Sequence, residues 1–107
     1  MAIQLEVEVV KQKEVQTFET PIFYKHIVSE DDYYAEIRGV ITDSSVISIH
    51  KTSKYDSLIY EIEKERNFSP NSYKAYITNP EYRSSKEEFK VFYDAMLDFL
   101  VVNEPKL

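Results

Sequence analysis

The feature that most constrains the fold of this chain is a regular alternation of apolar and polar residues in its first half. At the N-terminal end, single polar residues separate Ile3, Leu5, Val7 and Val9. A period of two places successive side chains on opposite faces of a strand, as in a half-buried sheet. Comparable runs follow at 15–18, 22–28, 33–41 and 46–52. Because connectors as short as 29–32 and 42–45 join antiparallel neighbours, about 2–52 are predicted to form an antiparallel meander of four to five strands.

The second half of the chain shows a helical period instead. Apolar side chains stand at the i, i+3, i+4 and i+7 positions Tyr55, Leu58, Ile59 and Ile62. This spacing lines one face of a helix and predicts a helix over about 55–66. Ser69-Pro70 is a helix start signal and Asn79-Pro80 a stop signal, so a short helix is predicted over about 70–78.

A third helix is predicted over about 85–102. Ser85 and Glu88 have the spacing of a capping box, in which each side chain reaches the backbone of the other. The apolar stripe that follows contains Phe89, Phe92, Tyr93, Met96, Phe99 and Leu100. Strands followed by helices are typical of the α+β class, and 107 residues suit one domain, 1–107. We therefore expect an antiparallel sheet with two to three helices packed on one face.

The expected pairing of the strands divides the sheet into two unlike faces. With Val28 opposite Tyr33 and Ile41 opposite Val46, one face carries all the formal charges of these strands. The charged side chains are Lys25, Glu36, Arg38 and Lys51. The other face has no formal charge, and we expect it to lie beneath the helices.

The composition excludes several classes of protein. The chain has 19 acidic and 13 basic residues, a formal net charge of −6, and no cysteine. Since affinity for nucleic acids comes mainly from Lys and Arg, we expect no direct nucleic-acid binding, and a helix–turn–helix over 59–77 would present one basic group at most. The longest purely apolar stretch, 99–102, is too short to span a membrane, and the first residues do not resemble a signal peptide. A chain without cysteine suits a reducing compartment, and we expect it in the cytoplasm.

No motif in the sequence encodes a reaction. The single glycine, Gly39, excludes the glycine-rich phosphate loops, and no cofactor or metal site is expected. His26 and His50 share the uncharged face but are expected two strands and about 10 Å apart, in different rows. We therefore expect each to be a half-buried histidine bonded to backbone or tyrosine, with no catalytic role.

The remaining signal is an acidic turn beside two tyrosines. Tyrosine is enriched at binding surfaces because its rigid ring offers contact area at little entropic cost. Neighbouring strand residues point to opposite faces, so one of the two rings must leave the core. The predicted partner-binding residues are Glu30, Asp31, Asp32, Tyr33 and Tyr34.

Three functions remain open at this stage. The first is a small non-catalytic protein-binding module, such as an acidic inhibitor or an immunity-type protein that occupies the basic surface of a partner. The second is a structural or self-assembling homodimeric protein that pairs through a strand edge. The third is a small enzyme with a pocket over the sheet face of His26 and His50.

Overall fold

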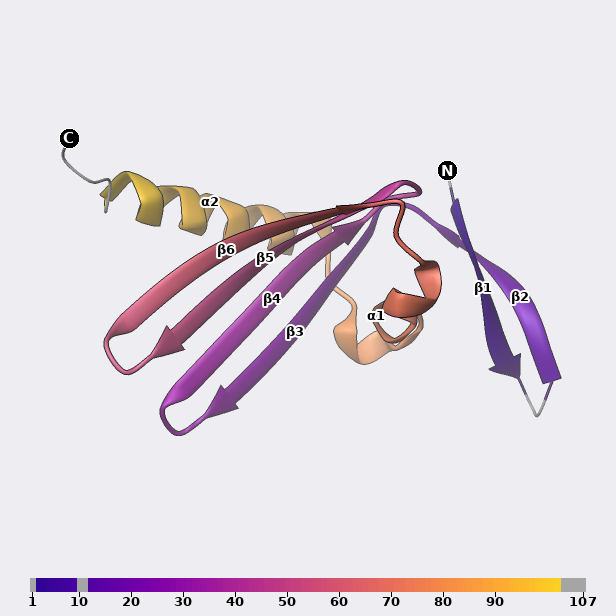
Figure 1. Cartoon of the computed structure of the whole chain (residues 1–107), viewed down its shortest axis with the longest axis horizontal. Coiled ribbons are helices and arrows are strands. Elements are labelled where there is room, and N and C mark those ends of the chain that lie inside the picture. The colour runs from indigo at the N-terminus through magenta and orange to yellow at the C-terminus, as the bar shows by residue number, and fades with distance from the viewer. Residues whose placement is uncertain (1, 10–11, 103–107) are drawn as a thin grey trace.

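The computed structural model describes residues 2–9 and 12–102, which form six antiparallel strands in two sheets and two helices. In chain order these are β1 (Ala2–Val9), β2 (Gln12–Glu19), β3 (Ile22–Glu30), β4 (Tyr33–Ile41), β5 (Ser45–Lys54), β6 (Ser57–Arg66), α1 (Lys74–Thr78) and α2 (Lys86–Val102). Single 3-10 turns, Pro70–Tyr73 and Pro80–Tyr82, flank α1. The chain is α+β, as the sequence predicts (Figure 1).

The predicted meander is divided into two sheets. Among the described residues, β1 and β2 form a two-stranded sheet, and β3 to β6 form a four-stranded sheet in chain order. The division falls at Thr20-Pro21, where proline has no N–H to donate to a ladder. The β1–β2 hairpin packs over one face of the larger sheet, where Ile3 and Leu5 are buried.

The helix predicted over 55–66 is wrong, because these residues form the second strand of a hairpin. Tyr55 and Asp56 make a two-residue turn, and β6 then pairs with β5 from Ser57 to Arg66. Leu58, Tyr60 and Ile62 also stand at every second position, as in a strand. The sequence pattern therefore fits both a helix and a strand. Pairing with β5 extends over all ten residues of β6 and gives alternate residues backbone hydrogen bonds, which decides between them.

The predicted register holds for one strand pair and fails for another. Ile41 lies opposite Val46, as expected. Between β3 and β4, however, Glu30 lies opposite Tyr33, so the connector is only Asp31-Asp32 and the pairing is shifted by two residues. A shift of two preserves the faces, because side chains alternate with a period of two.

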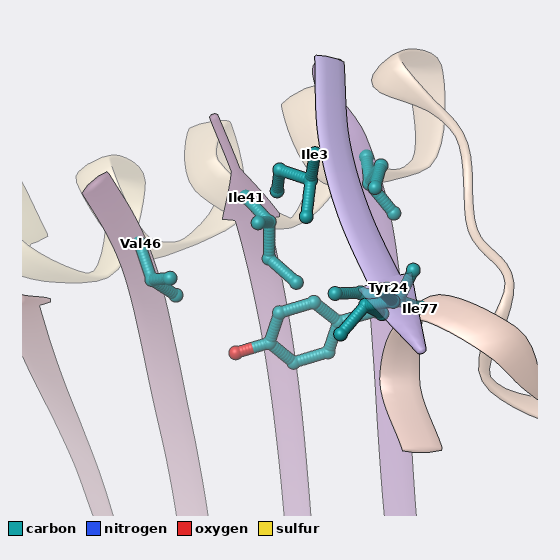
Figure 2. Packing of buried hydrophobic residues seen from close by; sticks show 7 residues of the cluster. Ile3, Tyr24, Ile41, Val46 and Ile77 are labelled. Carbon is teal, nitrogen blue, oxygen red and sulfur yellow. The ribbon is translucent and has the colours of Figure 1, made fainter. Parts of the chain in front are cut away.

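The hairpin face of the sheet, which we define by Ile22, Tyr24, Ile41 and Val46, carries the larger core. These side chains pack against Ile3 and Leu5 of β1 and Ile77 of α1. Figure 2 shows Ile3, Tyr24, Ile41, Val46 and Ile77 converging between the strands, the hairpin and the short helix. Tyr76 of α1 stacks on Tyr24 with ring centroids 4.3 Å apart, which anchors the short helix to β3.

The opposite face, which we call the α2 face, carries a second core. Phe92 and Met96 of α2 are buried against Ile49 of β5, and Phe89 and Tyr60 pack beside them. The prediction that the helices lie on one uncharged face is therefore wrong: α1 lies on the hairpin face and α2 on the face that carries the charges. Both faces have a cover.

A polar network allows α2 to pack on the charged face. Arg38 Nε donates to Glu36 Oε2 at 2.6 Å, and Arg38 Nη1 donates to Glu88 Oε2 of α2 at 3.0 Å. Only 14% of the Arg38 side chain and 10% of the Glu36 side chain is exposed to solvent. A charge is tolerated under a helix when it is paired and hydrogen-bonded. Ser85 Oγ accepts from Glu88 N as in the predicted capping box, whereas the Glu88 carboxylate contacts Ser84 and Arg38.

The covers of the two faces reach only part of the sheet. The structure measures 56 × 32 × 23 Å, and the strands of the larger sheet extend away from both cores toward their hairpin turns (Figure 1). Several large apolar side chains near these turns are exposed, among them Ile27, Val28, Tyr33, Tyr55 and Ile59. One end of the sheet is thus a packed scaffold and the other end is open to solvent.

Candidate partner-binding surface

The predicted partner-binding residues lie at the open end of the four-stranded sheet. Asp31 and Asp32 form the turn between β3 and β4, and Tyr55 and Asp56 form the turn between β5 and β6. These two turns lie at the same end of the sheet (Figure 1), and the register places Tyr33 directly opposite Lys54. We call the surface formed by both turns the tip surface; its residues are Glu30, Asp31, Asp32, Tyr33, Tyr34, Ser53, Tyr55 and Asp56.

The tip surface combines acidic groups with exposed tyrosine rings. The carboxylates of Glu30, Asp31, Asp32 and Asp56 are on exposed residues. Tyr33 is 38% exposed and Tyr55 is 76% exposed. An open hollow of about 230 Å³ is bounded by residues of both turns, from Glu30 to Tyr34 on one side and Ser53 and Tyr55 on the other. Two segments that are distant in sequence therefore build one concave acidic surface.

Tyr34 differs from the other tip tyrosines because its hydroxyl is already engaged. It donates to Glu36 Oε1 at 2.6 Å, on the α2 face of the sheet. This hydrogen bond, together with partial burial, raises the pKa of Tyr34 to about 12. The ring of Tyr34 borders the tip surface, while its hydroxyl belongs to the network of Glu36 and Arg38. Of the two predicted tyrosines, Tyr33 is the one with the exposed ring.

Tyr55 occupies an unusual backbone position. Its φ of 55° lies in the left-handed region, which glycine or asparagine normally occupies in two-residue hairpin turns. The turn projects the ring into solvent, where Lys54 Nζ lies 5.7 Å from its centroid. Residues held in such sparsely populated backbone regions cluster at active sites and ligand-binding sites.

The two histidines lie in one row of the sheet, which corrects the prediction of different rows. The two-residue shift of β3 places His26 opposite Ile37, and Ile37 opposite His50. Two strand spacings still separate the rings by about 10 Å. His26 Nδ1 lies 3.0 Å from the Tyr76 hydroxyl, which agrees with the expected tyrosine-bonded role. A hollow of about 260 Å³ beside His26 is bounded by Lys25, Ile27, Glu81 and Tyr82, and His50 is not among its lining residues.

His50 lies close to a serine and an acid, a combination that invites comparison with a catalytic triad. Its Nε2 is 3.0 Å from Ser48 Oγ and 3.6 Å from Glu63 Oε2, so the prediction that His50 is bonded to backbone or tyrosine is wrong. A triad requires the two ring nitrogens to have separate partners, one for the serine and the other for the acid. Here both contacts use the same nitrogen, and Ser48 is buried, so the geometry does not present a serine nucleophile to a substrate.

A groove beside α2 combines apolar side chains with charged groups. It has a volume of about 380 Å³ and is lined by Val91, Phe92 and Ala95 of α2, with Glu36 and Arg38 at the sheet. Hydrogen bonding to Ser84, followed by Arg38 and Lys25, holds the pKa of Glu88 at its rim below the usual value. In this groove Arg38 pairs with both Glu36 and Glu88, and these contacts join α2 to β4.

Sequence reasoning located half of the tip surface and missed the other half. The helix predicted over 55–66 includes Tyr55 and Asp56, so the sequence does not predict their position beside Asp31 and Asp32. The turn lacks the glycine or asparagine that normally signals a two-residue hairpin. The sequence feature that indicates the hairpin is the apolar residue at every second position of 58–62, which is typical of a strand that follows a short turn.

Two general properties complete the description of the surface. Within 2–9 and 12–102, no group of three or more His, Asp or Glu side chains is placed to hold a metal ion. Nor does any helix in these ranges combine the length and apolar character needed to cross a bilayer.

Comparisons with protein-family models, with curated proteins and with solved structures gave no match to this chain.

Proposed function

We propose that this chain is a non-catalytic protein-binding module that docks the tip surface on a basic region of a partner protein. The observation that carries the proposal is the meeting of two hairpin turns in one acidic, tyrosine-bearing hollow at the uncovered end of the sheet. Four exposed carboxylates attract a basic surface, and exposed tyrosine rings supply the contact area that makes such an encounter stable.

The proposed mode of action is occupation of a surface. An acidic module of this kind suits an inhibitor or immunity-type protein that covers the basic groove of its partner, for example one that binds nucleic acid. A net charge of −6 accelerates association with such a partner at low salt and has less effect at high salt. The absence of cysteine suits a reducing compartment, and the cytoplasm is the proposed location.

The test is a capture experiment with matched charge variants. The tip variant carries Glu30→Gln, Asp31→Asn, Asp32→Asn and Asp56→Asn. The control variant neutralises the same number of exposed acids elsewhere, with Glu8→Gln, Glu14→Gln, Glu19→Gln and Asp98→Asn. Each form is immobilised, exposed to host lysate, and its retained proteins are quantified by mass spectrometry.

The expected result is a set of basic proteins retained by the wild type and the control but released by the tip variant. Their release should also increase with salt concentration, because the attraction is electrostatic. Equal retention by the tip variant and the control would contradict the proposal.

A further inference from the structure

The two edges of the four-stranded sheet differ in how they are covered. At the β3 edge, Ser84 N donates to Phe23 O at 3.0 Å, and Tyr24 forms a bridge with Arg83. At the other edge, β6 is the last strand, and in the part of the chain that the structure describes no strand pairs with its outer side. An edge strand presents a row of free backbone donors and acceptors, which can pair with an added strand.

α2 extends toward the position that an added strand would occupy. Phe92 and Met96 lie over Ile49 of β5, and the Phe99 ring lies 5.2 Å from the Tyr60 ring of β6. The helix continues beyond Phe99, and Figure 1 shows its C-terminal end on the β6 side of the sheet. Three more residues, to Val102, advance the helix axis by about 4.5 Å in the same direction.

The last turns of α2 have apolar side chains without a cover. Leu100 is 50% exposed, and Ile62 of β6 is exposed on the same face of the sheet. An amphipathic helix normally buries such residues. A strand added beside β6 would lie beneath this end of α2 and cover them.

The opposite face of β6 indicates the charge of the partner. Glu61, Glu63 and Glu65 are exposed and share the hairpin face. Their neighbours on β5 are His50, Ser48 and Val46, so none of the three has a lysine or arginine directly opposite. Basic residues on an outer strand would complete these rows, since opposite charges across strands stabilise a sheet.

A second copy of β6 does not meet this requirement. A two-fold axis through the edge pairs residues of the same face with one another. In registers centred at residues 61, 62 and 63, the opposed pairs are Glu61 with Glu61, Glu61 with Glu63, and Glu63 with Glu63. Like charges directly opposite destabilise the pairing. The three glutamates therefore disfavour self-association in these central registers of β6, whereas they attract a basic strand.

We propose that the outer edge of β6 accepts an extended segment of a partner protein in which basic and apolar residues alternate. The basic side chains lie against Glu61, Glu63 and Glu65, and the apolar side chains lie against Ile62 and the end of α2. This site is separate from the tip surface, and its test does not depend on the function proposed above.

The test uses a synthetic peptide of about nine residues in which lysine and valine alternate. Binding is measured by fluorescence anisotropy, and backbone amide shifts in NMR spectra locate the peptide. A peptide of the same composition, with all lysines in one block, controls for charge alone. Two further peptides are N-methylated, one at every lysine and the other at every valine. Successive N–H groups of a strand point to opposite edges, so only one of the two should lose binding.

The matched protein variants are Glu61→Gln/Glu63→Gln/Glu65→Gln and Glu8→Gln/Glu14→Gln/Glu19→Gln. We expect the alternating peptide to shift β6 amides, and the β6 variant to bind it about tenfold more weakly than the control variant. The tip variant should bind it as the wild type does. Failure of the alternating peptide to bind, equal binding of the block peptide, equal effects of both methylations, or β6-mediated dimers in sedimentation would overturn the proposal.

Discussion

The two ends of the four-stranded sheet are built on different principles. At the covered end, the side chains of Ile41 and Ile77 are completely buried, and β1, β3, β4 and β5 all contribute buried side chains. At the open end, the strands continue past their cover into two acidic turns with exposed tyrosines. A module that acts by contact benefits from this division, because a rigid end can present an exposed one without a large loss of order on binding.

The largest expected effects come from the covered end. Ile41→Ala and Ile77→Ala each remove a side chain with no solvent exposure and should destabilise the fold by about 2 to 5 kcal/mol. Ile59→Ala is the matched control near the tips, where the side chain is 52% exposed, and should cost less than about 1 kcal/mol. Urea unfolding monitored by circular dichroism measures all three. Equal losses at both ends would show that the open end is also packed.

Gly39 marks a close approach within the covered end. A Cβ atom at this position would lie 2.1 Å from the Tyr24 ring. Gly39→Ala should therefore displace Tyr24 and destabilise the fold by about 1 to 3 kcal/mol. Equilibrium unfolding measures the loss, and a neutral effect would mean that the Tyr24 ring is free to move. Replacement of Ser53 by alanine, on a half-buried site near the tips, is the control.

Tyrosine ionisation should distinguish the packed scaffold at high pH. Burial raises the pKa of Tyr24 above its usual value of 10, and burial together with Glu65 raises that of Tyr73 to about 12. An unfolded tyrosine ionises near pH 10, so this stability is complete below pH 10 and declines as the pH rises through 12. Thermal unfolding at about pH 9 and about pH 11.5 should show a falling Tm, with a smaller fall in Tyr24→Phe. An unchanged Tm in the wild type would contradict the burial of these hydroxyls.

A substitution at the open end should have a small effect on stability, and it should stabilise the fold where the substitutions above destabilise it. Tyr55→Gly removes a bulky residue from the left-handed region and should stabilise the fold by about 1 kcal/mol. The same change removes the most exposed ring of the tip surface, so it should weaken retention of the captured partners. Tyr55→Asn retains the favourable backbone and also lacks the ring, and should behave in the same way. Stability and capture that fall together would indicate a structural role for Tyr55.

The parts of the fold that sequence reasoning predicted are those governed by one clear local period. The alternation of Ile3, Leu5 and Val7 predicted a strand, and the capping residue Ser85 with its apolar stripe predicted α2. The Ile41–Val46 pairing was also correct. These features depend on neighbouring residues, so the sequence alone contains the necessary information.

Two of the predictions that failed depend on tertiary contacts. Residues 57–66 satisfy both a helical and a strand period, and pairing with β5 decides between them. α2 was expected on an uncharged face, but the network of Arg38, Glu36 and Glu88 makes the charged face suitable for packing. The ambiguity of residues 57–66 also explains why the sequence does not predict half of the tip surface. Tyr55 and Asp56 become neighbours of Asp31 and Asp32 only when β6 is a strand.

The most direct test of the central claim is hydrogen–deuterium exchange of the chain with and without a captured partner. Contact through the open end predicts slower exchange in 30–34 and 53–57 and unchanged exchange in the β1–β2 hairpin. Protection confined to the β1–β2 hairpin or to α1, with the two turns unaffected, would contradict it.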